Sequence, residues 1–175
     1  GSGKSTFLKI LAGLYKPTKG FVYLDGIDMQ LIKRDFLTEN ISYLPQSTKL
    51  FAGTLRDNLI FGMIGISDEQ IIEAAKLTGL IGLINALPNG LDTVVPEGGE
   101  SVSGGQKQLI ALTRMIVANK KIILLDEPTA SMDEGTERQI ISMLHQKLSP
   151  EQTMVVVTHK PIVLNMVDRI IVLTP

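Results

Sequence analysis

Residues 121–127 read KIILLDE, and this stretch decides the fold class. Four consecutive apolar residues, from Ile122 to Leu125, are followed directly by the carboxylates of Asp126 and Glu127. A continuous apolar run of this kind is typical of a strand that is buried on both faces of a parallel sheet. Because ligands bind at the carboxyl ends of strands in open α/β sheets, both acids are expected at a ligand site.

Two more short apolar runs fit the same parallel sheet. ISYL at residues 41–44 predicts a strand, and Gln46 follows it closely. TMVVV at residues 153–157 predicts another strand, with His159 just beyond its ligand-binding end. We also expect a last strand at residues 169–175, RIIVLTP.

Helical patterns alternate with these strands and are interrupted by a helical insert. Apolar residues recur at helical spacing at the start of the chain, Ser67 is suited to cap a helix, and residues 133–148 predict a helix after the central strand. Shorter elements are expected at residues 21–26, a strand and turn, and at residues 161–167, a helix. We therefore expect one α/β domain, with a core formed by residues 1–49 and 119–175 and a helical subdomain formed by residues 50–118.

Length and composition exclude several classes of protein. The chain has 175 residues, enough for one domain with a real core. Its net charge of −1 argues against a basic face that would bind nucleic acid. It has no cysteine, which excludes disulfides and thiolate metal sites, and its apolar runs are far shorter than the roughly 18–20 residues of a membrane span. Since the sequence starts with Gly1 rather than Met, we expect it to be a piece of a longer protein.

The first six residues, GSGKST, have the composition of a phosphate-binding loop. Glycine lets the backbone approach a phosphate closely, and a helix that follows directs its free N–H groups toward the anion. Lys4 would bridge the outer phosphates of a nucleotide, and the Ser5 hydroxyl would bind Mg²⁺. Read alone, the stretch could also be a turn, but the amphipathic helical pattern after it favours the phosphate loop.

Three further stretches carry candidate chemistry. Asp126 would hold Mg²⁺ through water, and Glu127 could accept a proton from an attacking water, although the pair could also merely cap a turn. SVSGGQKQ at residues 101–108 starts a helix with exposed backbone N–H groups, which makes it a second anion site or an ordinary glycine-rich helix entry. A lone histidine is more often structural than catalytic, and His145, inside a helix, is assigned to that class.

In this order, the motifs resemble the ATP-binding-cassette (ABC) ATPase domain across essentially the whole chain. GSGKST resembles the end of the Walker A motif, and VSGGQ resembles the signature LSGGQ with Val102 in the leucine position. Gln46 matches the Q-loop, IILLDEPTA the Walker B motif, and ASMD the D-loop. His159 matches the H-loop histidine. The resemblance implies a P-loop NTPase with a mainly parallel sheet and an inserted helical subdomain.

The resemblance also implies partners, ligands and residue roles. Two such domains would form a head-to-tail dimer, in which each ATP with its Mg²⁺ lies between one domain's Walker motifs and the other's signature. The implied ATP-binding residues are Gly1, Ser2, Gly3, Lys4, Ser5 and Thr6, and the signature residues that act in trans are Ser103, Gly104, Gly105 and Gln106. The implied catalytic residues are Glu127, His159 and Gln46, the implied metal-binding residues are Ser5, Gln46 and Asp126, and Asp133 is the acid of the D-loop.

Two stretches resemble exporters within this family. LFAGTLRDNLIFG at residues 50–62 resembles the exporter stretch LFxGTxxxNI, and VVPEGGESVSGGQ resembles the exporter loop before the signature, except at Pro96 and Gly98. EPTASMD and the stretch THKPIVLNMVDRIIVL at residues 158–173 look most like bacterial type I secretion ATPases, which export RTX-type proteins and adhesins. The resemblance thus implies a transmembrane partner domain and a place on the cytoplasmic face of the inner membrane.

The sequence pattern has three alternative interpretations. A soluble ABC ATPase of translation or chromosome maintenance would carry a coiled-coil insertion or a basic linker, which the sequence lacks. A nucleotide-binding regulatory module that does not hydrolyse ATP would usually have lost Glu127 and His159. A P-loop kinase of small molecules would lack the SGGQ and DEPT stretches. The first two readings stay open as alternatives.

Overall fold

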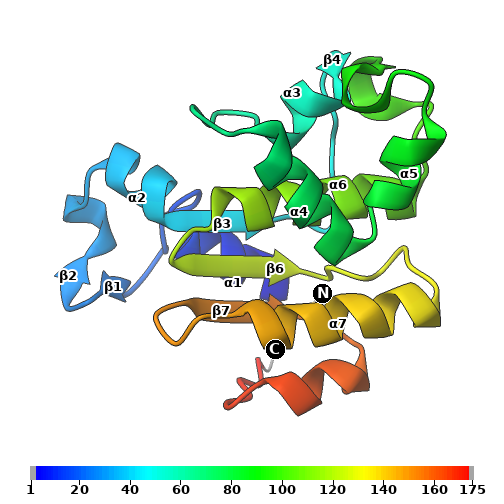
Figure 1. The fold of residues 1–175 in the computed structure, drawn as a ribbon. Coiled ribbons are helices and arrows are strands. Elements are labelled where there is room, and N and C mark those ends of the chain that lie inside the picture. Colours follow the sequence, from blue (N-terminus) through cyan, green and yellow to red (C-terminus); the bar gives the residue numbers. More distant parts are fainter. Residues whose placement is uncertain (1–2, 174–175) are drawn as a thin grey trace.

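A three-stranded parallel sheet forms the centre of the computed structural model, which describes residues 3–173 (Figure 1). Its strands, in spatial order, are β3 (Ile41–Leu44), β6 (Ile122–Asp126) and β7 (Thr153–Val157). In register, Tyr43 lies beside Leu124, and Leu124 lies beside Val155. The predicted α/β fold with a parallel sheet is confirmed.

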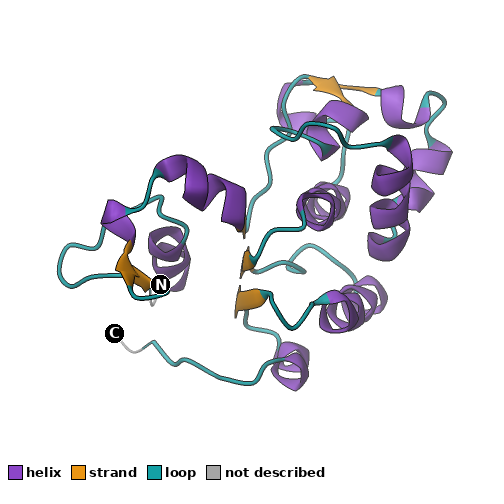
Figure 2. Cartoon of the chain, turned by 60° about the vertical axis from the view of Figure 1, so that its left-hand side comes forward, coloured by secondary structure: helices purple, strands orange, loops and turns teal. Residues whose placement is uncertain are grey.

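Helices cover both faces of this sheet, as Figure 2 shows with the strands seen nearly end-on. On one face, Leu8 of α1 (Lys4–Leu11) and Leu37 of α2 (Arg34–Asn40) pack with Leu124. The other face is covered by α6 (Gly104–Ala118) and α7 (Glu134–Lys147), whose buried core residues are Ala111, Leu112, Met115, Ile140, Met143 and Leu144. Since β6 is buried from both sides, a continuous apolar run was the right signal for it.

The inserted segment has a hydrophobic core of its own. It contains α3 (Leu55–Leu59), α4 (Asp68–Thr78), α5 (Ile81–Ala86) and the short helices η2 (Gly90–Asp92) and η3 (Glu97–Gly99). It also contains an antiparallel pair that the sequence did not predict, β4 (Gly53–Thr54) with β5 (Val94–Val95). Because Ile110 of α6 belongs to this core while Leu112 of α6 belongs to the core of the sheet, α6 joins the two. The boundaries 50–118 stay a prediction.

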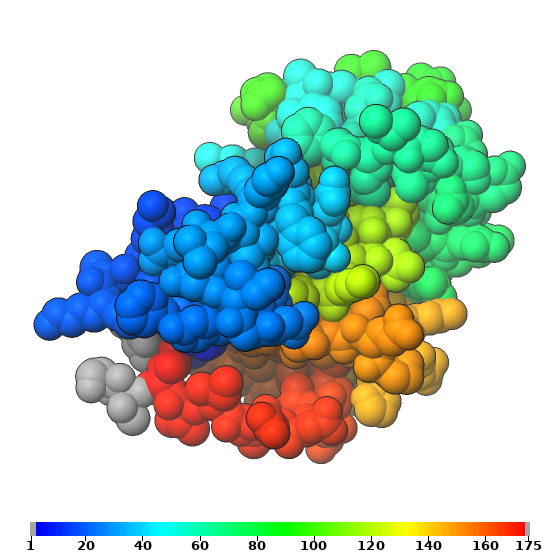
Figure 3. All heavy atoms as spheres, turned by 90° about the vertical axis from the view of Figure 1, so that its left-hand side faces the viewer, coloured from blue at the N-terminus to red at the C-terminus, as the bar shows by residue number. Residues whose placement is uncertain are grey.

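A small hairpin stands beside the first helix. Its strands are β1 (Tyr23–Leu24) and β2 (Ile27–Asp28), and η1 (Met29–Leu31) follows. The turn places Asp25 and Gly26 at φ of 50° and 80°, a conformation that glycine and aspartate tolerate best. This hairpin and its neighbours form the blue lobe in Figure 3.

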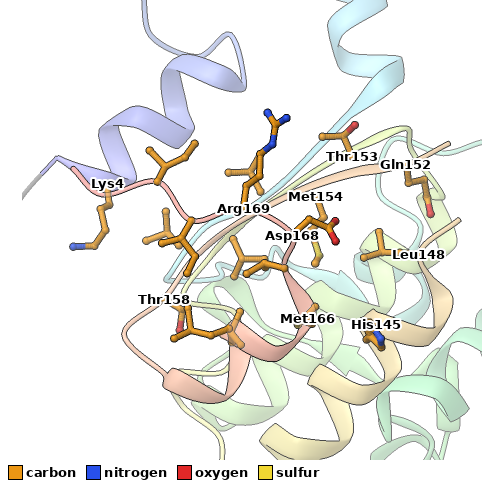
Figure 4. A pocket seen from close by; sticks show the side chains of 18 of the residues that line it. Lys4, His145, Leu148, Gln152, Thr153, Met154, Thr158, Met166, Asp168 and Arg169 are labelled. Atoms are coloured by element: carbon orange, nitrogen blue, oxygen red, sulfur yellow. The ribbon is translucent and has the colours of Figure 1, made fainter. Parts of the chain in front are cut away.

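The end of the chain differs from the prediction. Residues 161–166 form the short helix η4 (Pro161–Met166), as expected, but residues 167–173 form a loop, so the predicted last strand is wrong over the described residues. A strand needs a hydrogen-bonded neighbour, and a groove of about 730 Å³ lies between this loop and β7 (Figure 4). Ile171, with a relative exposure of 68%, therefore stays largely open to solvent. No helix within residues 3–173 has both the length and the apolar character needed to cross a membrane.

Candidate active site

The carboxyl ends of β6 and β7 bring together an acid and a histidine. Glu127 follows β6 directly, and its backbone N–H donates to the Val157 carbonyl oxygen at 2.8 Å. Its Oε1 lies 3.5 Å from Nε2 of His159, which follows β7. The Glu127 side chain is 12% exposed and that of His159 is 76% exposed. The histidine can therefore face a ligand from solvent while the acid stays sheltered behind it.

The backbone of Glu127 is in an unusual conformation. Its φ is 50°, in the left-handed region that non-glycine residues seldom adopt. Such strain persists only where neighbouring contacts hold it, and it is concentrated at functional sites. The loop that starts at Glu127 therefore has a shape that β6 alone would not produce.

Two buried carboxylate oxygens at this edge lack a hydrogen-bond donor within the described chain. They are Oδ1 of Asp126, whose residue is 2% exposed, and Oε1 of Glu127. Burying an anionic oxygen without a partner is costly, so Asp126 Oδ1 favours a cation or a donor from a ligand, while Glu127 Oε1 faces His159 Nε2 at 3.5 Å. Burial, and then the negative charge of the nearby Asp126, raises the pKa of the Tyr43 hydroxyl, which therefore stays neutral. The Asp126 carboxylate fits a Mg²⁺ site.

A larger cluster of metal ligands is absent from residues 3–173, where no three histidine or acidic side chains form a group that could hold an ion. Mg²⁺ keeps several waters and needs only one or two carboxylates besides the phosphates of a substrate. Ser5 lies in the first turn of α1, and the exposed Gln46 follows β3. Gln46 has no hydrogen bond to Asp126 or Glu127 in the described part of the chain.

The start of α1 lies beside the end of β7. Gly3 caps α1 with φ of 77°, and its carbonyl accepts from the Phe7 N–H at 2.9 Å. Lys4 and Thr158 line the same groove, in which Figure 4 shows both side chains. Ser5 and Thr6 complete the first turn of α1. Gly1 and Ser2, two of the predicted ATP-binding residues, lie outside the described residues.

The predicted signature forms the first turn of α6. Ser103 caps this helix, its Oγ accepting from the Gln106 N–H at 3.2 Å, while Gln106 Oε1 accepts from the Ser103 N–H at 2.9 Å. This reciprocal pair is a capping box. A side chain at Gly105 would meet the Ser131 carbonyl oxygen at 3.1 Å, so it would push the loop after β6 away by a few tenths of an ångström. Gly104 precedes it in the same turn.

Asp133 of the predicted D-loop caps α7. Its Oδ1 accepts from the Thr136 N–H at 3.0 Å, and its Oδ2 accepts from the Thr136 hydroxyl at 2.7 Å. These bonds, the backbone bond first, lower the pKa of the Asp133 carboxyl. Asp133 therefore fixes the end of the loop that begins at Glu127.

Four polar residues that the sequence reading missed brace this loop. The buried Gln108 carboxamide bonds both Glu127 and Ser131, and the Thr129 hydroxyl donates to Glu137 Oε1 at 2.7 Å. Lys160 Nζ donates to Glu137 Oε2 at 3.2 Å. A signal did exist: Gln108 and Glu137 occupy apolar helix positions, four residues before Leu112 and Ile141.

Comparison with known proteins supports a family assignment. The family model described as "ABC transporter" matches residues 1–130. The chain is 39% identical over 173 residues to ABC transporter B family member 13 of Arabidopsis thaliana. The matched region covers 99% of this chain but 14% of that relative. It is 39% identical over 174 residues to the lactococcin transport/processing ATP-binding protein LcnC-like of Lactococcus lactis, with 99% of this chain and 24% of that relative covered.

A solved structure has the same fold. The structure of a bacterial Atm1-family ABC exporter with ATP bound matches with a TM-score of 0.85 at 34% identity. The match covers 91% of this chain and 28% of that chain. The chain thus spans between about one seventh and three tenths of the relatives it matches.

Proposed function

We propose that this chain serves as the nucleotide-binding domain of an exporter. The chain belongs to the ABC transporter family, and it has the P-loop fold of that family's ATP-binding domain, which is an ATPase. In this role it would bind ATP with Mg²⁺ and couple hydrolysis to transport. Similarity to the Atm1-family exporter supports the assignment to exporters. The exporter itself is a proposal, because the chain covers 28% of that structure.

The observation that carries the proposal is the pairing of Glu127 with His159. The two side chains come from the carboxyl ends of neighbouring parallel strands, and their Oε1 and Nε2 atoms lie 3.5 Å apart. Glu127 Oε1 is buried and accepts no hydrogen bond in the described chain besides this contact with His159, so it can accept a proton from a water. The pairing supports turnover, because a nucleotide-binding module that does not hydrolyse ATP would usually have lost these two residues.

The chemistry would then run as a phosphoryl transfer to water. Glu127 would orient a water and accept its proton as the water oxygen bonds to the γ-phosphorus, while the bond to the β-phosphate oxygen breaks and releases ADP. Lys4 and His159 would contact the γ-phosphate and offset its charge. Mg²⁺, when bound by Ser5, Gln46 and water on Asp126, would neutralise charge on the phosphates.

We further propose that the signature acts on a second nucleotide, in a head-to-tail dimer of two such domains. The first turn of α6 exposes Ser103 and Gly104. In the dimer, these residues and Gly105 would face the γ-phosphate held by Lys4 of the other domain. ATP would close such a dimer, and hydrolysis would open it. Asp133 would lie at the same interface.

The finer assignment concerns the transported molecule and the membrane. We propose a protein or peptide substrate, a transmembrane domain on the same polypeptide and a place on the cytoplasmic face of a bacterial inner membrane. The name of the lactococcin transport/processing relative supports a peptide, and the resemblance of EPTASMD and the last residues to type I secretion ATPases supports a protein.

The experiment that tests the proposal is Glu127→Gln in the native protein that carries this chain. Because the amide cannot accept the proton, ATP hydrolysis should fall by about a hundredfold or more, while ATP binding stays intact and an ATP-bound dimer accumulates. Phosphate release and size-exclusion chromatography with Mg-ATP measure the two effects. Hydrolysis at the parental rate would remove Glu127 from the mechanism.

A further inference from the structure

Gln108 occupies a position that the chemistry above does not explain. It lies in the second turn of α6, and with a relative exposure of 2% it is among the most buried polar residues of the described chain. Its Nε2 donates to the Glu127 carbonyl oxygen at 3.2 Å, and its Oε1 accepts from the Ser131 N–H at 3.0 Å. The nitrogen and the oxygen of the Gln108 carboxamide thus both form hydrogen bonds with the same loop.

These two bonds join α6 to both ends of the turn that carries the proposed base. The Glu127 carbonyl also accepts from the Ala130 N–H at 3.2 Å, which closes the turn, and Ser131 follows that turn. The strained φ of Glu127 needs such external support. Gln108 therefore contributes to holding the backbone of Glu127 in this conformation.

The same helix carries the signature at its start. Gly105 lies three residues before Gln108, and the Ser131 carbonyl approaches it so closely that a side chain there would meet it at 3.1 Å. Ser131 is thus held through its N–H by Gln108 and contacted at its carbonyl by the first turn of α6. The first two turns of α6 and the loop after β6 are therefore connected by a hydrogen bond and a close backbone approach.

The far side of the loop is held separately. Thr129 donates to the buried Glu137 of α7, and Lys160 donates to the other oxygen of the same carboxylate. These contacts tie the loop to α7 and to the segment after His159. Because these contacts do not involve α6, we expect them to hold the loop when the contacts from Gln108 are removed.

We propose that Gln108 is a positioning residue for ATP hydrolysis, which holds the backbone of Glu127 and transmits movement of the signature turn to it. The inference rests on the proposed function, because Glu127 must be the base for its position to matter. In a dimer, the signature turn would contact the nucleotide of the other domain, while Glu127 serves the nucleotide of its own domain. Gln108 would then link the occupancy of one site to the alignment of the base in the other.

The test is Gln108→Met in the native protein that carries this chain, since methionine keeps the length but removes both hydrogen bonds. A misplaced base should lower kcat about ten- to a hundredfold, with KM for ATP changed by about threefold or less. Gln146→Met is the matched control, because Gln146 is an exposed residue of α7 that bonds only Ser142 in the described chain. Its kcat should equal that of the parent.

A double variant separates positioning from a general loss of structure. If Gln108 acts through Glu127, adding Gln108→Met to Glu127→Gln should cause no further loss of hydrolysis. A parental kcat in Gln108→Met, or a full further loss in the double variant, would overturn the inference. If Gln108→Met does not fold, Gln108→Glu carries the same test, because it keeps the acceptor for Ser131 and loses the donor to Glu127.

The proposed function and this inference fail differently. Parental hydrolysis in Glu127→Gln would remove the base itself and with it the premise. Loss of hydrolysis in Glu127→Gln together with a parental kcat in Gln108→Met would leave the function standing and remove only the role of Gln108.

Discussion

The chain contains two glycine-rich helix starts, and they are built differently. At the start of α1, the cap is Gly3, which has no side chain to accept from the N–H groups of the first turn. At the start of α6, Ser103 and Gln106 satisfy each other's backbone N–H groups in a capping box. Both starts carry the partial positive charge of a helix N-terminus, but α6 has a side chain that accepts from an N–H of its first turn and α1 has none.

This difference suits two separate roles: α1 would bind the nucleotide of its own domain, and α6 would contact the nucleotide of a second domain. The first turn of α1 follows a glycine cap, and Lys4 and Ser5 stand on it, which suits a loop that wraps the phosphates of its own nucleotide. The first turn of α6 is held by its capping box and packs on Ser131, which suits a surface that is offered to a nucleotide held elsewhere. In the proposed head-to-tail dimer, the start of α1 would bind one nucleotide and the start of α6 would contact the other.

The largest effect is expected from Lys4→Ala at the start of α1. Loss of the cation that would bridge the outer phosphates should weaken ATP binding and lower hydrolysis by about a hundredfold or more, as expected when a main electrostatic contact to the reacting group is lost. Equilibrium binding of a fluorescent ATP analogue and phosphate release measure both effects. Lys9→Ala, on the last turn of the same helix, is the control and should change neither.

A smaller effect is expected from Ser103→Ala, which removes the cap of α6. Its loss should lower the free energy of unfolding by about 0.5–2 kcal/mol and should also reduce hydrolysis. Ser67→Ala is the matched control, because Ser67 caps α4 with the same kind of box, formed with Gln70. Denaturant melts should show similar losses of stability, whereas only Ser103→Ala should lose activity; equal activity in both would contradict a role for the signature.

A third prediction contrasts the glycines of the two helix starts. Gly3 has φ of 77° with open space around its Cα, so Gly3→Ala should cost about 1–2 kcal/mol of stability through backbone strain. Gly105 lies inside a helix but against the Ser131 carbonyl, so Gly105→Ala should instead displace the loop that carries Glu127 and lower kcat. Melting curves and turnover together distinguish strain from displacement.

The smallest effect is expected at Asp133. Its pKa is lowered in the folded chain, so its charge adds stability above the ordinary aspartate pKa of 3.8, and this contribution is lost as the pH falls through the lowered value. Asp133→Asn keeps a capping side chain but cannot ionise. The stability difference between parent and variant should therefore be constant near neutral pH and should shrink below pH 3.8, as pH-dependent melts can show.

Much of the fold could be read from the sequence because its signals are local. The apolar run before Asp126 specified a buried parallel strand, and Ser67 and Ser103 marked helix starts that the structure contains. Residues 169–173 were assigned wrongly, because a strand depends on a neighbour that no local pattern reveals. The two-residue pair of β4 and β5 is too short to leave any pattern.

The candidate site could be predicted only in part. Motif positions identified the side chains at strand and helix ends, among them Glu127 and His159, and the structure places these two side by side. The bracing contacts of Gln108 and Glu137 join residues 19 and 8 positions apart in the chain. Such partners are set by tertiary packing, although a polar residue on an apolar helix face signals that one must exist.

The most direct test of the central claim, that the two helix starts serve different nucleotides, is a mixing experiment in the native protein. Lys4→Ala and Ser103→Arg variants are each expected to be inactive alone. A mixed head-to-tail dimer would combine the intact Lys4 of one domain with the intact Ser103 of the other, so the mixture should hydrolyse ATP faster than either variant alone. Mixed dimers that form and hydrolyse no faster than the separate variants would contradict the claim.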